Sequence, residues 1–173
     1  EQLSSKSTEK SLGMTVDNVA SGGHEICKRL AMAESALKSS KELWKGGLKT
    51  VKKLNILNMT VFSVAFPNAE IMSYNPAQRK KLEDFYERAI RRVTYKRVQG
   101  EHFDLVKDRK ERSFREICLK WKMPEFWSVF LREKRLVWLA HEFRTAVREK
   151  DLRIPNAIQR ELDQESNWGK QLQ

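Results

Sequence analysis

Residues 25–37 read EICKRLAMAESAL, and this stretch decides the fold. Four of its apolar side chains recur at spacings of three and four residues: Ile26, Leu30, Ala33 and Leu37. Trp44 lies one heptad after Leu37, so the apolar face continues. Such a period predicts an amphipathic helix. Because residues 21–23 and 46–47 carry glycines that break a helix, we expect this helix over about 24–45.

The sequence predicts two further helices after this one, again from the pattern of their apolar residues. The segment from about 48 to 66 is apolar nearly all round in its later half, which predicts burial on several faces. The next helix opens with an N-cap at Asn75, a proline at the first helical position, and Gln78 placed for a capping box. Its apolar stripe consists of Leu82, Phe85, Ala89 and Val93.

The pattern is interrupted at Gln99-Gly100, where we expect a domain boundary. Beyond it the sequence predicts a helix around 114–121 that ends at Met123-Pro124, a long helix over 124–150, and a short one from Pro155. Residues 12–16 suggest one short strand. We therefore expect an all-α protein, a bundle of about five to six helices with at most a short N-terminal β-hairpin. The expected domains are a lead-in over 1–20, a three-helix bundle over 21–98 and a helical extension over 99–173.

The charge of the chain points to its class of partner. Lys and Arg number 34 against 23 Asp and Glu, a net charge of +11, which favours RNA, DNA, an acidic protein surface or an anionic membrane. No apolar run approaches the roughly 20 residues that span a bilayer, so we expect no membrane insertion. Cys27 and Cys118 are far apart, which favours a reducing, intracellular compartment, either mitochondrion or nucleus and cytoplasm. The chain begins at Glu1, which fits a processed protein or a trimmed piece of one.

Three groups of basic residues are candidate contacts to nucleic acid. They are Lys45, Lys49, Lys52 and Lys53 around the first inter-helix turn, Arg88, Arg91, Arg92, Lys96 and Arg97 at the end of the third helix, and Arg132 and Arg135 on the long helix. On the third helix the apolar stripe fixes the opposite face, so we expect several of these cations to point into solvent. Changing Arg91 and Arg92 to glutamine should then weaken binding and leave folding nearly intact. Competing interpretations are a solvated helix end for the second group and intrahelical pairing with Glu133 for the third.

Nothing in the sequence has the pattern of an active site. His24, His102 and His141 lie in different predicted elements without metal-ligand spacing, and Cys118 sits beside Phe114 in an apolar stripe. No serine-hydrolase, zinc-protease or phosphate-loop motif occurs. We therefore expect no catalysis, no metal, no cofactor and no small-molecule substrate.

Five segments together resemble a known family. In order they are SLGM over 11–14, EICKRLAMAESAL over 25–37, LKTVKKLNILNMTVFSVAFPNAE over 48–70, KKLEDFYE over 80–87 with RRV over 91–93, and LREKRLVWLAHEFR over 131–144. They resemble the thumb and the following helices of non-LTR retrotransposon reverse transcriptases. The resemblance spans about 11–160 and is strongest over 24–97. Departures are Phe66-Pro67 where the family has Tyr-Gly, Met72 where it has Trp, and Ala140 where it has Gly.

The resemblance implies a binding module without the polymerase's catalytic centre. The family's metal-binding aspartates lie in the palm, which this sequence does not include. In a thumb fold the first inter-helix turn lies near a duplex backbone. We therefore expect an RNA-binding module or a structural subunit of a large ribonucleoprotein, such as an organellar ribosome, that contacts RNA phosphates and neighbouring proteins. The alternatives are a structural protein on an acidic protein lattice, cytoskeletal or axonemal, and a thumb fragment of an active reverse transcriptase.

Overall fold

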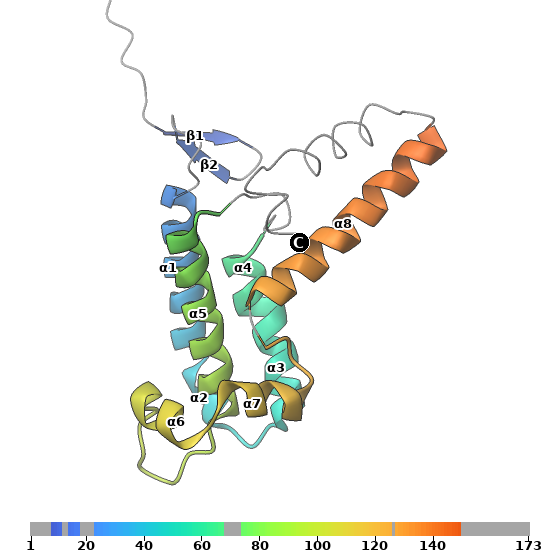
Figure 1. Cartoon of the computed structure of the whole chain (residues 1–173). Helices are drawn as coiled ribbons and strands as arrows, with labels where there is room; N and C mark the ends of the chain where they lie inside the picture. The colour runs from blue at the N-terminus through green and yellow to red at the C-terminus, as the bar shows by residue number, and fades with distance from the viewer. Residues whose placement is uncertain (1–7, 12–13, 18–22, 68–73, 126, 150–173) are drawn as a thin grey trace, which may run out of the picture. The chain divides into compact units, whose positions relative to one another are not determined.

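The computed structural model describes residues 8–11, 14–17, 23–67, 74–125 and 127–149 (Figure 1). These residues are helical apart from one small hairpin, so the all-α prediction is confirmed. Six of the helices in these ranges have seven residues or more. In the hairpin, β1 (Thr8–Ser11) pairs antiparallel with β2 (Met14–Asp17). The helix expected from Pro155 lies outside the described residues.

By their internal contacts the residues fall into two units. The first comprises Glu1–Pro67 and Arg88–Glu111, and the second Asn68–Glu87 and Arg112–Gln173. Helix α5 (Pro76–Thr94) contributes its first part to the second unit and its last part to the first. The boundary expected after residue 98 falls inside the first unit. The apolar stripe of α5 runs through the whole helix and gives no sign of this division.

In the first unit the predicted helix over 24–45 is divided in two. Helix α1 (Gly23–Ser39) is followed by α2 (Lys41–Lys45), with Ser40 between them. The Trp44 indole Nε1 donates a 2.9 Å hydrogen bond to the Leu37 carbonyl, so this side chain folds back over the interruption. Both Leu37 and Trp44 are buried, as their apolar spacing predicted.

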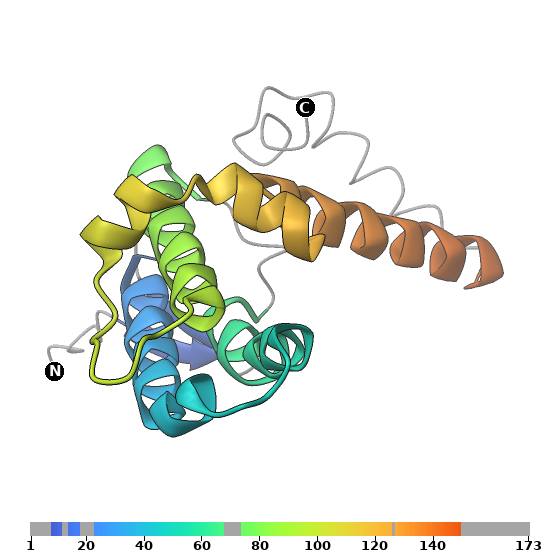
Figure 2. The same ribbon diagram turned by 90° about the horizontal axis from the view of Figure 1, so that it is seen from below.

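The second predicted helix is continuous but changes its pitch. It consists of α3 (Thr50–Leu57), the π-helical turn η1 (Asn58–Phe62) and α4 (Ser63–Ala65), which follow one another along the chain (Figures 1 and 2). Of these, η1 and α4 pack against α1. The hydroxyls of Thr60 and Ser63 donate to the carbonyls of Ile56 and Met59. The apolar side chains of this helix are buried on one side only, since Met59 is 76% exposed. The expectation that the later half is buried on several faces is therefore wrong.

The second unit is built on the first part of α5, helix α7 (Phe114–Trp121) and helix α8 (Trp127–Glu149). Tyr86 is fully buried, and its ring contacts those of Phe114 and Phe130 at centroid distances of 6.5 and 5.9 Å. Helix α7 ends at Lys122 in a left-handed conformation, φ 52°, ahead of the predicted Met123-Pro124 stop. Cys118 is buried and its Sγ donates to the Pro124 carbonyl at 3.3 Å, as a core residue does.

The predicted capping box at the start of α5 is confirmed. Asn75 Oδ1 accepts from the Gln78 amide at 2.8 Å, and Gln78 Oε1 accepts from the Asn75 amide at 2.9 Å. We expect Asn75→Ala to lower the free energy of unfolding by about 1 kcal/mol, whereas Asn75→Ser keeps a capping oxygen and costs less. Urea unfolding of both variants checks this, and equal losses for alanine and serine would contradict the capping role.

Candidate nucleic-acid interface

Six lysines lie close together in the sequence around the first inter-helix turn. We call them the lysine belt: Lys38, Lys41, Lys45, Lys49, Lys52 and Lys53. They come from the end of α1, from α2, from the loop after Gly46-Gly47 and from the start of α3. All but Lys53 are exposed. Between residues 38 and 53 the sequence offers a single carboxylate, Glu42, so this turn carries a strong positive charge.

Lys53 stabilises the conformation of this turn. Its Nζ donates a 2.6 Å hydrogen bond to the Trp44 carbonyl, which joins the start of α3 to the end of α2. Burial lowers the pKa of Lys53. Lys45 Nζ lies 2.9 Å from Glu42 Oε1, an exposed pair that is worth little in water. Lys53 is thus a positioning residue, and the exposed lysines around it are the ones that can reach a phosphate.

A second group of cations lies at the end of α5 and just beyond it. We call Arg88, Arg92, Lys96 and Arg97 the α5 basic group. Arg88 pairs with Glu34 of α1 at 3.2 Å. Arg92 is half-buried, and burial, then Arg97 and then Arg88 lower its pKa, against which the carboxylate of Glu34 acts. The carboxylate of Glu34 therefore acts on both Arg88 and Arg92.

Arg92 contributes a buried donor to this group. Its Nε is buried and makes no hydrogen bond within the part of the chain that the structure describes. Buried donors are normally paired, and a guanidinium fits the oxygens of a phosphate well. An anion placed here would neutralise Arg92 and relieve its repulsion from Arg88 and Arg97.

The end of α5 comes near the lysine belt at Glu42. The hydrogen bond and charge of Lys45 lower the pKa of Glu42, and the charges of Lys41 and Arg97 lower it further. Arg97 therefore lies close enough to α2 to act on the lysine belt. Together the belt and the α5 basic group provide ten cations, accompanied in residues 34–53 and 88–97 by two carboxylates, Glu34 and Glu42.

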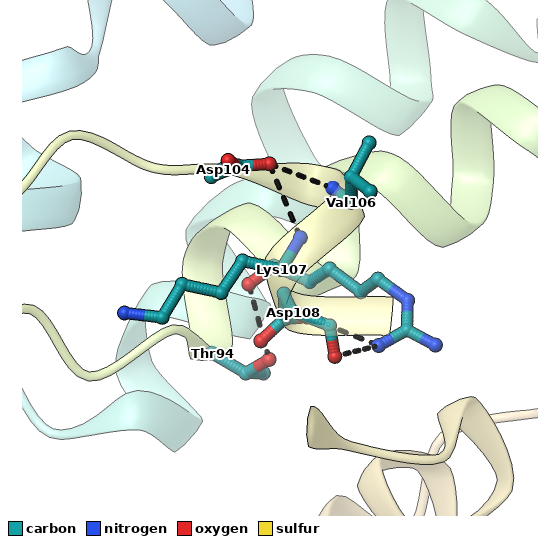
Figure 3. A network of polar contacts seen from close by, with 6 residues as sticks. Thr94, Asp104, Val106, Lys107 and Asp108 are labelled. Atoms are coloured by element: carbon teal, nitrogen blue, oxygen red, sulfur yellow. Dashed lines mark hydrogen bonds and ion pairs between the residues drawn. The ribbon is translucent and has the colours of Figure 1, made fainter. Parts of the chain in front are cut away.

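Arg91 does not belong to this surface. Its side chain is 4% exposed and its Nη1 lies 3.0 Å from Oδ2 of Asp108, itself 0% exposed, on α6 (Leu105–Glu111). Figure 3 shows the polar network around Asp108, including Asp104, whose Oδ1 accepts from the amides of Val106 and Lys107 and caps α6. The expectation of a solvent-facing Arg91 is wrong, because α6 covers that side of α5.

The two candidate cations on α8 differ in their exposure. Arg132 is exposed, whereas Arg135 is 0% exposed in the second unit. Burial lowers the pKa of Arg135 to about 10, with Tyr74 acting against this and Arg79 adding to it. Arg135 is therefore a buried residue, and the prediction that it contacts nucleic acid is corrected. The signal for this was its position between Leu131 and Leu139, four residues from each, on the face that α8 buries.

Reasoning from the sequence also missed two members of the interface. Lys38 and Lys41 belong to the lysine belt, although the predicted group began at Lys45. Their spacing was a usable signal, since Lys38, Lys41 and Lys45 are three and four residues apart and share a helical face.

Other kinds of site find little support in the described part of the chain. Within residues 8–11, 14–17, 23–67, 74–125 and 127–149, no group of three or more His, Cys, Asp and Glu side chains is placed to hold a metal ion. The described helices are each too short or too polar to cross a bilayer.

Comparison with known proteins gives no further guide: no family model, curated protein or solved structure matches this chain significantly.

Proposed function

We propose that this protein is a non-catalytic helical module that binds structured RNA through its phosphate backbone. The convergence of the lysine belt and the α5 basic group, ten cations with two carboxylates, carries this proposal. Lysine and arginine contacts of this kind fix position and register and do not read bases. A protein that binds RNA without selecting its sequence is suited to be a structural subunit of a large ribonucleoprotein. Our candidate for that assembly is an organellar ribosome, such as the mitochondrial one.

Two further points support RNA. Arg92 is only half-buried, so a phosphate that reaches the accessible part of its guanidinium adds a strong, charge-assisted contact. In addition, the five segments quoted above resemble the thumb and the following helices of a reverse transcriptase, and in a thumb fold the first inter-helix turn lies near a duplex backbone. In this protein that turn carries the lysine belt.

The salt dependence of RNA binding tests the proposal. If about six cations contact phosphates, a plot of log association constant against log salt has a slope of about −5. Replacing Lys45, Lys49 and Lys52 with glutamine should make the slope shallower by about 3 and weaken binding accordingly. Fluorescence anisotropy with a labelled RNA hairpin measures both.

A matched variant controls for the loss of charge alone. Replacing the exposed Lys81, Lys110 and Lys120 with glutamine changes the net charge equally and lies outside the belt. This variant should keep nearly the wild-type slope. A wild-type slope shallower than about −1, or equal losses in the two triple variants, would refute the proposed interface. Displacement of the hairpin by polyglutamate at equal charge concentration would instead favour the acidic protein lattice.

A further inference from the structure

The lysine belt surrounds one residue that a phosphate would repel. Glu42 lies on α2 between Lys41 and Lys45, and its side chain is 80% exposed. Its Oε1 accepts a 2.9 Å hydrogen bond from Lys45 Nζ, and its Oε2 accepts none from any residue that the structure describes. Because like charges repel, a carboxylate at this position lowers the affinity of the belt for a chain of phosphates.

Pairing with Lys45 is a weak reason for a carboxylate here, since an exposed ion pair contributes little to stability in water. The hydrogen bond and the charge of Lys45 lower the pKa of Glu42, so the side chain is ionised at neutral pH. An ionised carboxylate only accepts hydrogen bonds, and its partner must be a donor. Along the sugar-phosphate backbone of RNA, that donor is the ribose 2′-hydroxyl, which DNA lacks.

The spacing of the pair fits one nucleotide. In ribose, the carbon that bears the 2′-hydroxyl is bonded to the carbon whose oxygen carries the 3′-phosphate. Lys45 Nζ and Glu42 Oε1 are 2.9 Å apart, so a lysine on that phosphate brings the carboxylate to the neighbouring hydroxyl. Carboxylates accept hydrogen bonds from ribose hydroxyls in nucleotide-binding proteins. We propose that Glu42 accepts a hydrogen bond from a 2′-hydroxyl while Lys45 contacts the adjacent phosphate, so that the lysine belt selects RNA over DNA.

Two apolar residues of the same turn also suit contact with sugar. Leu48 and Val51 are exposed among the lysines of the belt. Aliphatic side chains gain nothing from a phosphate, whereas the carbon atoms of a ribose ring give them apolar surface to cover. The hydrogen bond from Lys53 Nζ to the Trp44 carbonyl ties the start of α3 to α2, the helix that carries Glu42. The turn thus offers groups for the sugar as well as for the phosphate.

Three hairpins of one sequence test the inference, which rests on the proposed binding of RNA. They are RNA, its 2′-fluoro form and DNA. The 2′-fluoro form keeps the A-form helix, but fluorine cannot donate a hydrogen bond, so it isolates the donor from the shape of the duplex. In anisotropy titrations we expect the full-length protein to bind RNA about fivefold more tightly than the 2′-fluoro hairpin, and to bind DNA at least as weakly as the 2′-fluoro form.

Glu42→Ala removes both the acceptor and the negative charge. This variant should bind the 2′-fluoro and DNA hairpins more tightly than the wild type, and its preference for RNA over the 2′-fluoro hairpin should fall to about one. Glu111→Ala is the matched control, because Glu111 is another exposed glutamate that lies near a lysine of its own helix, 3.9 Å from Lys107. The control should keep the fivefold preference. Both substitutions are on the surface and should leave folding nearly unchanged.

Three results would overturn the inference. Equal affinity of the wild type for RNA and the 2′-fluoro hairpin would show that no 2′-hydroxyl donates to the protein. A preference that survives Glu42→Ala would assign the hydroxyl contact to another residue. An equal gain for all three hairpins in Glu42→Ala would show that Glu42 only weakens phosphate binding. Each of these leaves the proposed function intact while the salt slope stays near −5, whereas a flat slope would refute both proposals.

Discussion

Replacing Asp108 with asparagine should lower the free energy of unfolding by about 3–5 kcal/mol, the largest effect we expect from any single change of charge. Arg91 and Asp108 have 4% and 0% exposed side chains and their charged atoms are 3.0 Å apart. Arg91 Nη1 also lies 3.4 Å from the Asp108 carbonyl. Asparagine keeps the shape of the side chain and removes its charge, so the guanidinium remains buried without the carboxylate that compensates it.

The control for this change lies one turn earlier. Asp104→Asn removes the same charge from an exposed N-cap, where asparagine caps as well as aspartate, and should cost only a few tenths of a kcal/mol. Replacing both members of the buried pair, Arg91→Met with Asp108→Leu, should recover most of the lost stability. Amide hydrogen exchange of α5 and α6 measures each effect locally. A small loss for Asp108→Asn, comparable with Asp104→Asn, would contradict the role of the pair.

Truncating Tyr86 to alanine should destabilise the second unit by about 3–5 kcal/mol. Its ring is fully buried, meets Phe114 edge to face at 89°, and lies 5.9 Å from Phe130. These contacts join the first part of α5 to α7 and α8, so the loss leaves a cavity where three helices meet. Burial also raises the pKa of the Tyr86 hydroxyl well above its usual range, so the hydroxyl is neutral when unfolding is measured near pH 7.

Tyr86→Phe separates the ring from the hydroxyl. The hydroxyl oxygen is 3.5 Å from the Pro124 carbonyl, at the long limit for a hydrogen bond, so this variant should lose about 1 kcal/mol or less. Denaturant unfolding followed by amide signals of α7 and α8 distinguishes the two variants. If phenylalanine were as damaging as alanine, the hydroxyl and not the aromatic packing would hold the helices together.

The sequence predicted best those features that neighbouring residues determine. The stripes on α1 and α5, the capping box at Asn75 and the stop at Met123-Pro124 depend on spacings of a few residues, and the structure confirms them. Helix α6 was missed, because it is only seven residues long and its start depends on the side chain of Asp104.

Arg91 shows why the candidate site was predicted only in part. On a helical wheel it lies opposite the stripe of α5, which predicts exposure for an isolated helix. Its burial depends on Asp108, 17 residues away, and no local pattern reveals that partner. The exposed lysines of the belt were easier to predict, because an exposed side chain needs no partner distant in the sequence.

The π-helical turn η1 (Asn58–Phe62) has a consequence for how the length of this chain can vary. Such a turn accommodates one residue more than an α-helical turn does. Loss of a residue from its exposed side would leave an ordinary helix, whereas the same deletion within α5 would rotate every later side chain by about 100°. Among the described helices, a single-residue deletion should therefore be best tolerated between Asn58 and Thr60.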